Sequence, residues 1–314
     1  MSLKSCFIGR LQACARVAGI SELREQVVEA KLLSARLLIR QMRAEGVLPR
    51  LADAEFKVFS QFGDDGIIQY LLQQVDIPEG SRKFIEFGVQ DYQESNTRFL
   101  LMNDNWSGLI LDGSSANIAK VVADAQFWRH DLTAVAAFID RDNVNDLFSR
   151  NGFKGEIGLL SVDIDGNDYW VWESIEVVNP IIVVCEYNSV FGAEHAVTVP
   201  YDPVFQRSAA HYSNLYWGVS LNALFLLASR RGYAFVGCNS AGNNAYFVRR
   251  DKLGSLRPLE CAEGYVEARF RESRNREGEL TYLPAGKRLS EIAQMPVFDV
   301  GRQSVALISE IFRR

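Results

Sequence analysis

Short apolar runs alternate with amphipathic stretches through the middle of the chain. In the amphipathic stretches, apolar residues recur every three or four positions. The apolar runs between these stretches are five to eight residues long and lie at 83–88, 108–113, 127–131, 157–163 and 181–188. Nearly continuous apolar runs of this length are typical of strands in a parallel sheet that helices cover on both faces. The pattern therefore predicts five successive strand–helix units.

The rest of the pattern completes a sheet. The amphipathic stretches predict helices at 66–75, 96–103, 115–125, 133–150, 168–175 and 219–231. Two further apolar runs, 233–238 and 244–249, flank the turn-forming sequence NSAGN, which is typical of a β-hairpin. The predicted fold is α/β, with a doubly wound, Rossmann-like sheet of seven strands, mostly parallel with an antiparallel closing strand.

The two ends of the chain differ from this alternating region. We expect three parts: an N-terminal helical segment with a linker (1–57), an α/β domain (58–254) and a C-terminal extension (255–314). A helix is predicted over 21–45, with Ser21 as its N-cap and Gly46 as its stop. A polar, aromatic-rich stretch at 189–217 is long enough to be a functional loop.

Charge and composition narrow the partners. The chain carries 34 basic and 39 acidic residues, and nine basic against four acidic residues fall in the first 50, so the remainder has a net charge of −10. An acidic main body argues against a nucleic-acid partner. The longest purely apolar run, Ile181–Cys185, is far shorter than the roughly 20 residues of a membrane span. Five cysteines without CxxC spacing predict reduced thiols and a cytoplasmic protein.

Each of the first five predicted strands ends in an acid, and ligands of open α/β sheets bind at the carboxyl ends of the strands. These acids are Glu86, Asp112, Asp131, Asp163 and Glu186. Gly88 follows the first of them, and a glycine there lets a ligand approach the backbone, while the second acid can accept hydrogen bonds from ribose hydroxyls. The chain has neither GxGxxG nor a P-loop, so the pattern favours a nucleoside without phosphates over NAD, FAD or ATP.

Three segments carry a resemblance to a known family: FIEFGVQDYQESNTRFLL (84–101), GLILDGS (108–114) and SVDIDGNDYWVW (161–172). With the order of elements, they resemble a class I S-adenosylmethionine (SAM)-dependent methyltransferase of the FkbM-like family, over about residues 59–249. The resemblance implies SAM as the cofactor, with cofactor-binding residues Glu86, Gly88, Asp112 and Asp131. It implies methyl transfer to an oxygen or nitrogen of a small-molecule or sugar acceptor. We expect Glu86→Ala to abolish cofactor binding without unfolding the protein.

The chain departs from the family at its first motif. That motif usually carries two or three glycines, whereas Gln90, Asp91 and Tyr92 stand at the corresponding positions here. Side chains at these positions lie where the methionine part of the cofactor is expected. A catalytically silent, methyltransferase-like binding module is therefore one alternative function.

Candidate catalytic and acceptor-binding residues follow the fourth and fifth strands. Asp163 and His195 are candidate general bases, since an acid at the fourth strand lies near the reacting groups in the resemblance and histidine titrates near neutral pH. The candidate substrate-binding residues are Asp165, Glu186, Asn188, Tyr201 and His211.

The motif at 163–168 has other interpretations. Asp163-x-Asp165 also resembles the DxD of metal-dependent glycosyltransferases, where carboxylates bind Mg²⁺ or Mn²⁺. It could equally be a turn in which Asp168 caps the next helix. We assign no metal ligand, and a divalent metal stays an alternative to SAM chemistry. A homodimer through the N-terminal helix or the C-terminal extension is also open.

Overall fold

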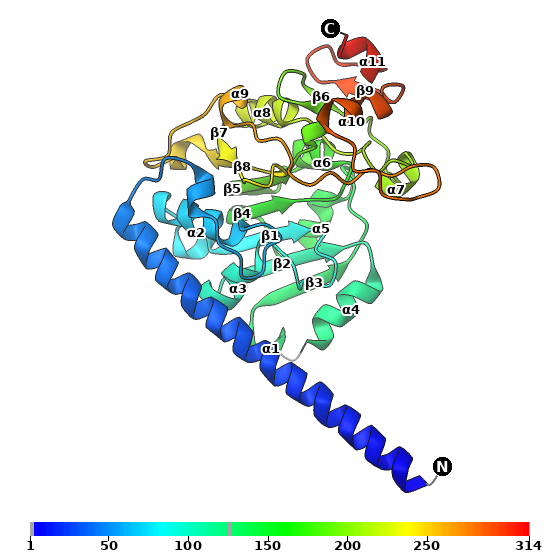
Figure 1. Cartoon of the computed structure of the whole chain (residues 1–314). Coiled ribbons are helices and arrows are strands. Elements are labelled where there is room, and N and C mark those ends of the chain that lie inside the picture. Colours follow the sequence, from blue (N-terminus) through cyan, green and yellow to red (C-terminus); the bar gives the residue numbers. More distant parts are fainter. Residues whose placement is uncertain (1–2, 125–126, 314) are drawn as a thin grey trace. The chain divides into compact units, whose positions relative to one another are not determined.

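A computed structural model describes residues 3–124 and 127–313 (Figure 1). The chain divides after Gly46 into two compact units, 1–46 and 47–314. The first contains α1 (Leu3–Glu45), which ends as expected at Gly46, whose φ is +78°. The helix begins at Leu3, so Ser21 lies inside it and the predicted N-cap is wrong; no proline interrupts residues 3–20. None of the helices in the described ranges is long and apolar enough for a membrane span.

The second unit is built on a seven-stranded sheet with the strand order β3-β2-β1-β4-β5-β8-β7. Its strands are β1 (Lys83–Phe87), β2 (Ser107–Asp112), β3 (Leu132–Ala136), β4 (Gly155–Val162), β5 (Val178–Glu186), β7 (Tyr233–Cys238) and β8 (Asn244–Arg249). Strands β1 to β5 pair in parallel, while β8 runs antiparallel to both β5 and β7. The predicted Rossmann-like fold, with its antiparallel closing strand, is confirmed.

Helices cover both faces of this sheet (Figure 1). They are α2 (Asp64–Gln74), α3 (Arg98–Asp104), α4 (Ser115–Ala123), α5 (Val144–Arg150), α6 (Asp168–Ser174) and α8 (Leu221–Arg230). Apolar side chains of α5, α6 and α8 form one core with alternate residues of the strands, such as Leu160 and Val183. The other residues of the strands face the opposite side, where Tyr246 of β8 donates a hydrogen bond to Asp64 of α2. Burial on both faces explains the continuous apolar runs.

The prediction for the third strand is wrong. Residues Phe127–Arg129 form a short 3-10 helix, and β3 lies at 132–136, where the sequence predicts the start of a helix. That helix, α5, begins only at Val144. The cause is that β3 is an edge strand whose residues are half-buried, so it lacks the continuous apolar run of a central strand.

A smaller sheet joins the long loop to the C-terminal extension. Strand β6 (Val197–Thr198) pairs with β9 (Pro296–Asp299), which pairs with β10 (Ser304–Leu307). Four short helices accompany it: α7 (Arg207–Ala210), α9 (Cys261–Gly264), α10 (Ala285–Glu291) and α11 (Ile308–Ile311). Apolar side chains of α7, α10, α11 and β9 form a second core, which lies near the C-terminus in Figure 1, whereas Cys261 of α9 belongs to the first core. The extension therefore has its own packed structure.

Candidate functional site

A polar cavity of about 160 Å³ lies where β1 and β4 end and β8 begins. It is lined by Gln61, Glu86, Phe87, Gly88, Val89, Gln90, Asp91, Gln93, Glu94, Ser95, Asn96, Asp163, Asn243 and Asn244. Carboxyl and amide side chains dominate this lining, which includes no lysine, arginine or histidine. The cavity thus lies at the edge of the sheet where the sequence predicts a ligand.

Glu86 at the end of β1 holds the loop that follows it. Its Oε1 accepts a hydrogen bond from the backbone amide of Asn96 at 2.9 Å. Its Oε2 accepts three, from the hydroxyl of Ser95 at 2.5 Å and from the amide (3.1 Å) and hydroxyl of Thr97. Burial raises the pKa of Glu86. With most of its lone pairs occupied, this carboxyl orders the loop before α3.

Gly88 allows the ends of β1 and β4 to approach each other. Its φ is +79°, and a Cβ atom at this position would lie 1.7 Å from the carbonyl oxygen of Asp163. The next turns are tight as well, since Gln90 and Tyr92 have φ values of +50° and +60°. The glycine is therefore required by the chain itself, and the close approach it permits is to β4.

Asp112 at the end of β2 can accept one further hydrogen bond from a ligand. Its Oδ1 accepts bonds from the amide of Ser114 (2.8 Å) and from Asn117, while its Oδ2 accepts one bond, from the amide of Gln90 at 2.8 Å. A carboxylate oxygen can accept two hydrogen bonds, so one lone pair of Oδ2 has no partner among the described residues. Beside it, a Cβ atom on Gly113 would lie 3.2 Å from the ring of Phe138, which is 52% exposed.

Asp131 is not at this edge. It precedes β3, so it lies at the amino end of that strand, and its exposed side chain belongs to the opposite edge of the sheet. The prediction that Asp131 binds the cofactor followed from the incorrect prediction of a strand at 127–131. The carboxyl end of β3 is instead followed by Phe138, which the sequence does not single out.

Asp163 and Glu186 lie side by side at the ends of β4 and β5. The strands pair in register up to Val162 and Cys185, so the two acids are the next residues on each. The side chain of Glu186 is close enough for a hydrogen bond to Asp163, which lowers the pKa of Asp163. Burial, and then the other carboxyl groups nearby, raise the pKa of both acids well above their ordinary values. Oε2 of Glu186 has no hydrogen-bond partner within the described part of the chain.

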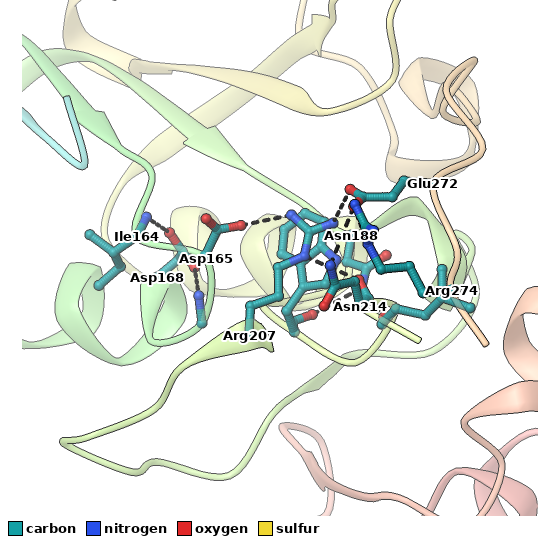
Figure 2. A network of polar contacts seen from close by, with 11 residues as sticks. Ile164, Asp165, Asp168, Asn188, Arg207, Asn214, Glu272 and Arg274 are labelled. Carbon is teal, nitrogen blue, oxygen red and sulfur yellow. Dashed lines mark hydrogen bonds and ion pairs between the residues drawn. The ribbon is translucent and has the colours of Figure 1, made fainter. Parts of the chain in front are cut away.

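The turn after β4 is held by two different acids (Figure 2). Asp168 is fully buried and accepts bonds from the amides of Ile164 (2.8 Å) and Gly166 (3.0 Å), and burial raises its pKa to about 7. Asp165 points outward, and its Oδ1 lies 2.8 Å from Nη1 of Arg207. The motif is therefore a turn, one of the three interpretations, but the predicted cap is wrong: Asn167 occupies the N-cap position of α6, and Asp168 accepts its bonds from the turn before the helix.

Arg207 ties this turn to the C-terminal extension. Its guanidinium lies 4.5 Å from the ring centroid of Trp217, donates to the carbonyl of Asn214 at 3.1 Å, and pairs with Glu272 at 3.4 Å (Figure 2). Because Asp165 is paired with a cation, it is a poor metal ligand. The described residues also contain no group of three or more histidine, cysteine, aspartate or glutamate side chains suited to a metal ion.

The remaining candidates lie outside the cavity lining. Asn188 donates to the carbonyls of Leu215 and Trp217, both at 3.0 Å, so it anchors the long loop. Tyr201 packs under Arg141, whose guanidinium is 4.0 Å from the ring centroid. The structure gives both residues packing partners within the chain, and neither of them lines the cavity.

Neither histidine is brought to Asp163. The ring of His195 packs edge-on against Phe312, 4.5 Å away, in the region of the second core. His211 shares a 2.7 Å hydrogen bond with the hydroxyl of Ser213, and burial lowers its pKa. Both belong to the long loop, and the pairing of that loop with the C-terminal extension draws them away from the strand ends.

Sequence reasoning missed the residues that support the cavity. Ser95 and Thr97 bind Glu86, and a run of hydroxyl and amide residues before a helix was the available signal. Asp64 accepts hydrogen bonds from Asn239 and Asn244, both at 2.9 Å, and fixes the start of β8. These three residues shape the site without a motif of their own.

Comparisons with known proteins give only distant likenesses. No family model and no curated protein matches the chain. Among solved structures, it is similar to the N-terminal domain of EvdMO1 with SAH bound (12% identity, 71% of this chain and 97% of that chain, TM-score 0.38). It is also similar to the O-methyltransferase from Bacillus cereus in complex with SAH (11%, 69% and 89%, 0.36) and to the DszA carbon methyltransferase (15%, 62% and 54%, 0.37). Likenesses this distant do not reveal an activity, which has to be inferred from the site.

Proposed function

We propose that this chain is an enzyme that transfers a methyl group from SAM to an oxygen or nitrogen of a small-molecule or sugar acceptor, as the FkbM-like resemblance implies. One observation carries the proposal. Asp112 keeps a lone pair that no described residue occupies, near the exposed ring of Phe138 and at the strand-end edge that also holds the acid-lined cavity. A carboxylate next to an aromatic face suits a nucleoside. The ribose hydroxyls can donate hydrogen bonds to the carboxylate, and the base can stack on the aromatic ring.

The residues at this edge fit SAM. Asp112 would bind the ribose hydroxyls, and Phe138 would pack against the adenine. The cavity is smaller than the roughly 300–1,000 Å³ of pockets that enclose drug-sized ligands. It would therefore hold only the amino-acid end of the cofactor, with amide side chains such as Gln90 and Asn96 around it. Glu86 would act indirectly, by ordering the loop that carries Asn96.

When bound, SAM supplies a methyl group on a positively charged sulfur. The task of the chain is to align the acceptor with that methyl group and to accept the acceptor's proton. Asp163 lines the cavity and is the base we assign. His195 is dropped from this role because it packs against Phe312.

The side chains that line the cavity also indicate which methyl acceptors would fit. Carboxyl and amide side chains donate to and accept from hydroxyl and amino groups, and a lining without basic residues disfavours multiply charged anions such as phosphates. A neutral polyhydroxylated molecule or an amine fits this chemistry. A sugar acceptor is consistent with it.

Calorimetric titration with SAM and with S-adenosylhomocysteine (SAH) tests the proposal. We expect dissociation constants on the order of micromolar for the wild type. Asp112→Asn should weaken binding about tenfold, the value of one hydrogen bond to a charged group. Asp131→Asn, at the opposite edge, is the matched control and should bind as the wild type does. The absence of binding by the wild type to both ligands would refute the proposed function.

A further inference from the structure

The ends of β4 and β5 bring two acids together with few other partners. Asp163 and Glu186 follow paired residues of adjacent parallel strands, so the backbone fixes them next to each other. Glu186 is 8% exposed, and its Oε2 is a buried oxygen without a hydrogen-bond partner among the described residues. Asp163 lines the cavity, whereas Glu186 does not. One acid of the pair therefore faces the site, and the other lies behind it.

Each element packed against the pair contributes charged or titratable groups. They are Glu86 on β1, Asp165 and Asp168 in the turn after β4, the Cys185 thiol on β5 and Arg207 on α7. Arg207 is the one cation among them, and its own hydrogen bonds go to Asp165, Asn214 and Glu272. Two full negative charges on these adjacent acids, one buried and one half-buried, would be strongly unfavourable in this setting. A shared proton removes that repulsion, as in other buried carboxyl pairs.

We propose that Asp163 and Glu186 work as one proton-sharing pair, in which Asp163 is the catalytic base and Glu186 is the positioning residue that holds the shared proton behind it. This inference rests on the proposed function, because the acceptor and the methyl donor would meet at the cavity. Glu186 is thereby reassigned from substrate binding to support of the base.

The two acids and the acceptor account for every proton in the reaction. Before the reaction, Glu186 carries the proton and donates its hydrogen bond to the Asp163 carboxylate. Asp163 takes the proton of the acceptor's O–H as the acceptor's oxygen forms its bond to the methyl carbon. The bond from that carbon to sulfur breaks, and its electron pair stays on the sulfur. The pair ends with two protons and returns one to water after product release.

A base of this kind suits an alcohol. A carboxylate with an ordinary pKa is a weak base at neutral pH, and a general base is most effective when its pKa is close to the working pH. Burial, and then the charges of Asp165 and Asp168, raise the pKa of Asp163 in that direction, and they outweigh the hydrogen bond from Glu186, which lowers it. Two carboxyl groups in different surroundings can divide the roles of proton holder and proton acceptor.

The first test needs no cofactor and no acceptor. It is a double-mutant cycle of Asp163→Asn and Glu186→Gln, with the free energy of unfolding measured between about pH 5 and about pH 9. A shared proton predicts that the coupling between the two residues stabilises the fold at low pH and becomes destabilising at high pH, where both acids are charged. The isosteric changes preserve the packing, and a cycle of Asp131→Asn with Glu186→Gln is the control without coupling. A coupling that is the same at every pH would overturn the proposal.

The second test separates this inference from the proposed function. SAM carries a positive charge that SAH lacks, so its binding beside the pair should release more protons than the binding of SAH. Calorimetry in buffers of different ionisation enthalpy measures this release. We expect the excess to disappear in Glu186→Gln while SAM still binds. An excess that Glu186→Gln leaves unchanged would overturn the inference, whereas failure of the wild type to bind either ligand, with a pH-dependent cycle, would overturn only the proposed function.

Discussion

Neighbouring strand ends in this sheet use carboxyl groups in opposite ways. At the end of β1, Glu86 accepts four hydrogen bonds from the loop at 95–97. At the ends of β4 and β5, Asp163 and Glu186 have mainly each other, and one oxygen of Glu186 has no partner among the described residues. All three lie where a parallel sheet presents its ligand-binding edge. The difference shows that the donors around a strand-end acid, more than its position, decide whether it orders the chain or is free for chemistry.

The strongest test of this comparison is Glu86→Ala. The change leaves two buried hydroxyls and two buried amides without their acceptor, and each such group costs about 1–3 kcal/mol. We expect the free energy of unfolding to fall by about 4 kcal/mol in denaturant titrations. This replaces the expectation from sequence that the variant stays folded and loses only cofactor binding. Glu86→Gln, which keeps one acceptor oxygen, should lose less, and unchanged stability of both variants would show that Glu86 does not hold the loop.

The next test moves the two strand ends apart. Gly88→Ala introduces a Cβ atom 1.7 Å from the carbonyl oxygen of Asp163, at a φ of +79°. We expect a loss of about 3 kcal/mol, because backbone must shift in addition to the left-handed strain. Gly152→Ala is a matched control with a φ of +81° and no atom within 4 Å, so its cost should be about 1 kcal/mol. Equal losses in the two variants would mean that β1 and β4 do not approach as closely at Gly88.

Asp168 is intermediate between the two cases, since it accepts two main-chain bonds and is fully buried. Its pKa is raised to about 7, so the protonated form is favoured in the folded state. A raised pKa contributes stability that is complete below the unfolded value and is lost as the pH rises through about 7. Between about pH 5 and pH 8 the free energy of unfolding should decrease by about 2 kcal/mol from this group. Denaturant titrations of Asp168→Asn should lack that part of the decrease, and an unchanged pH profile would contradict the assignment.

Much of the fold could be predicted because its central strands are buried on both faces. Strands β1, β2, β4 and β5 are therefore continuous apolar runs, and reading their last residues placed Glu86, Asp112, Asp163 and Glu186 at one edge. The half-buried edge strand β3 lacks such a run, and its misplacement carried Asp131 to the wrong edge.

The partners of the acids were beyond reach for a different reason. Arg207 meets Asp165 across 42 residues and Glu272 across 65, and no local pattern encodes such pairs. The same holds for His195, whose packing on Phe312 depends on the docking of the C-terminal extension. A sequence can show that an acid ends a strand, but the donors that satisfy it come from elsewhere in the chain.

The smallest expected effect concerns Arg207, the cation that links the turn after β4 to the extension. Both ion pairs have an acid that solvent reaches, since the side chains of Asp165 and Glu272 are 55% and 37% exposed, so Arg207→Met, which keeps an apolar stem against Trp217, should cost about 1 kcal/mol or less. Its influence on the acid pair should be clearer than its influence on stability. The positive charge of Arg207 lowers the pKa of Glu186, so its removal should move the pH dependence of the Asp163–Glu186 coupling to higher pH. Arg207→Lys retains the charge and should leave that pH dependence in place while losing the two-pronged contact, and identical profiles for the Met and Lys variants would show that the charge of Arg207 does not reach the pair.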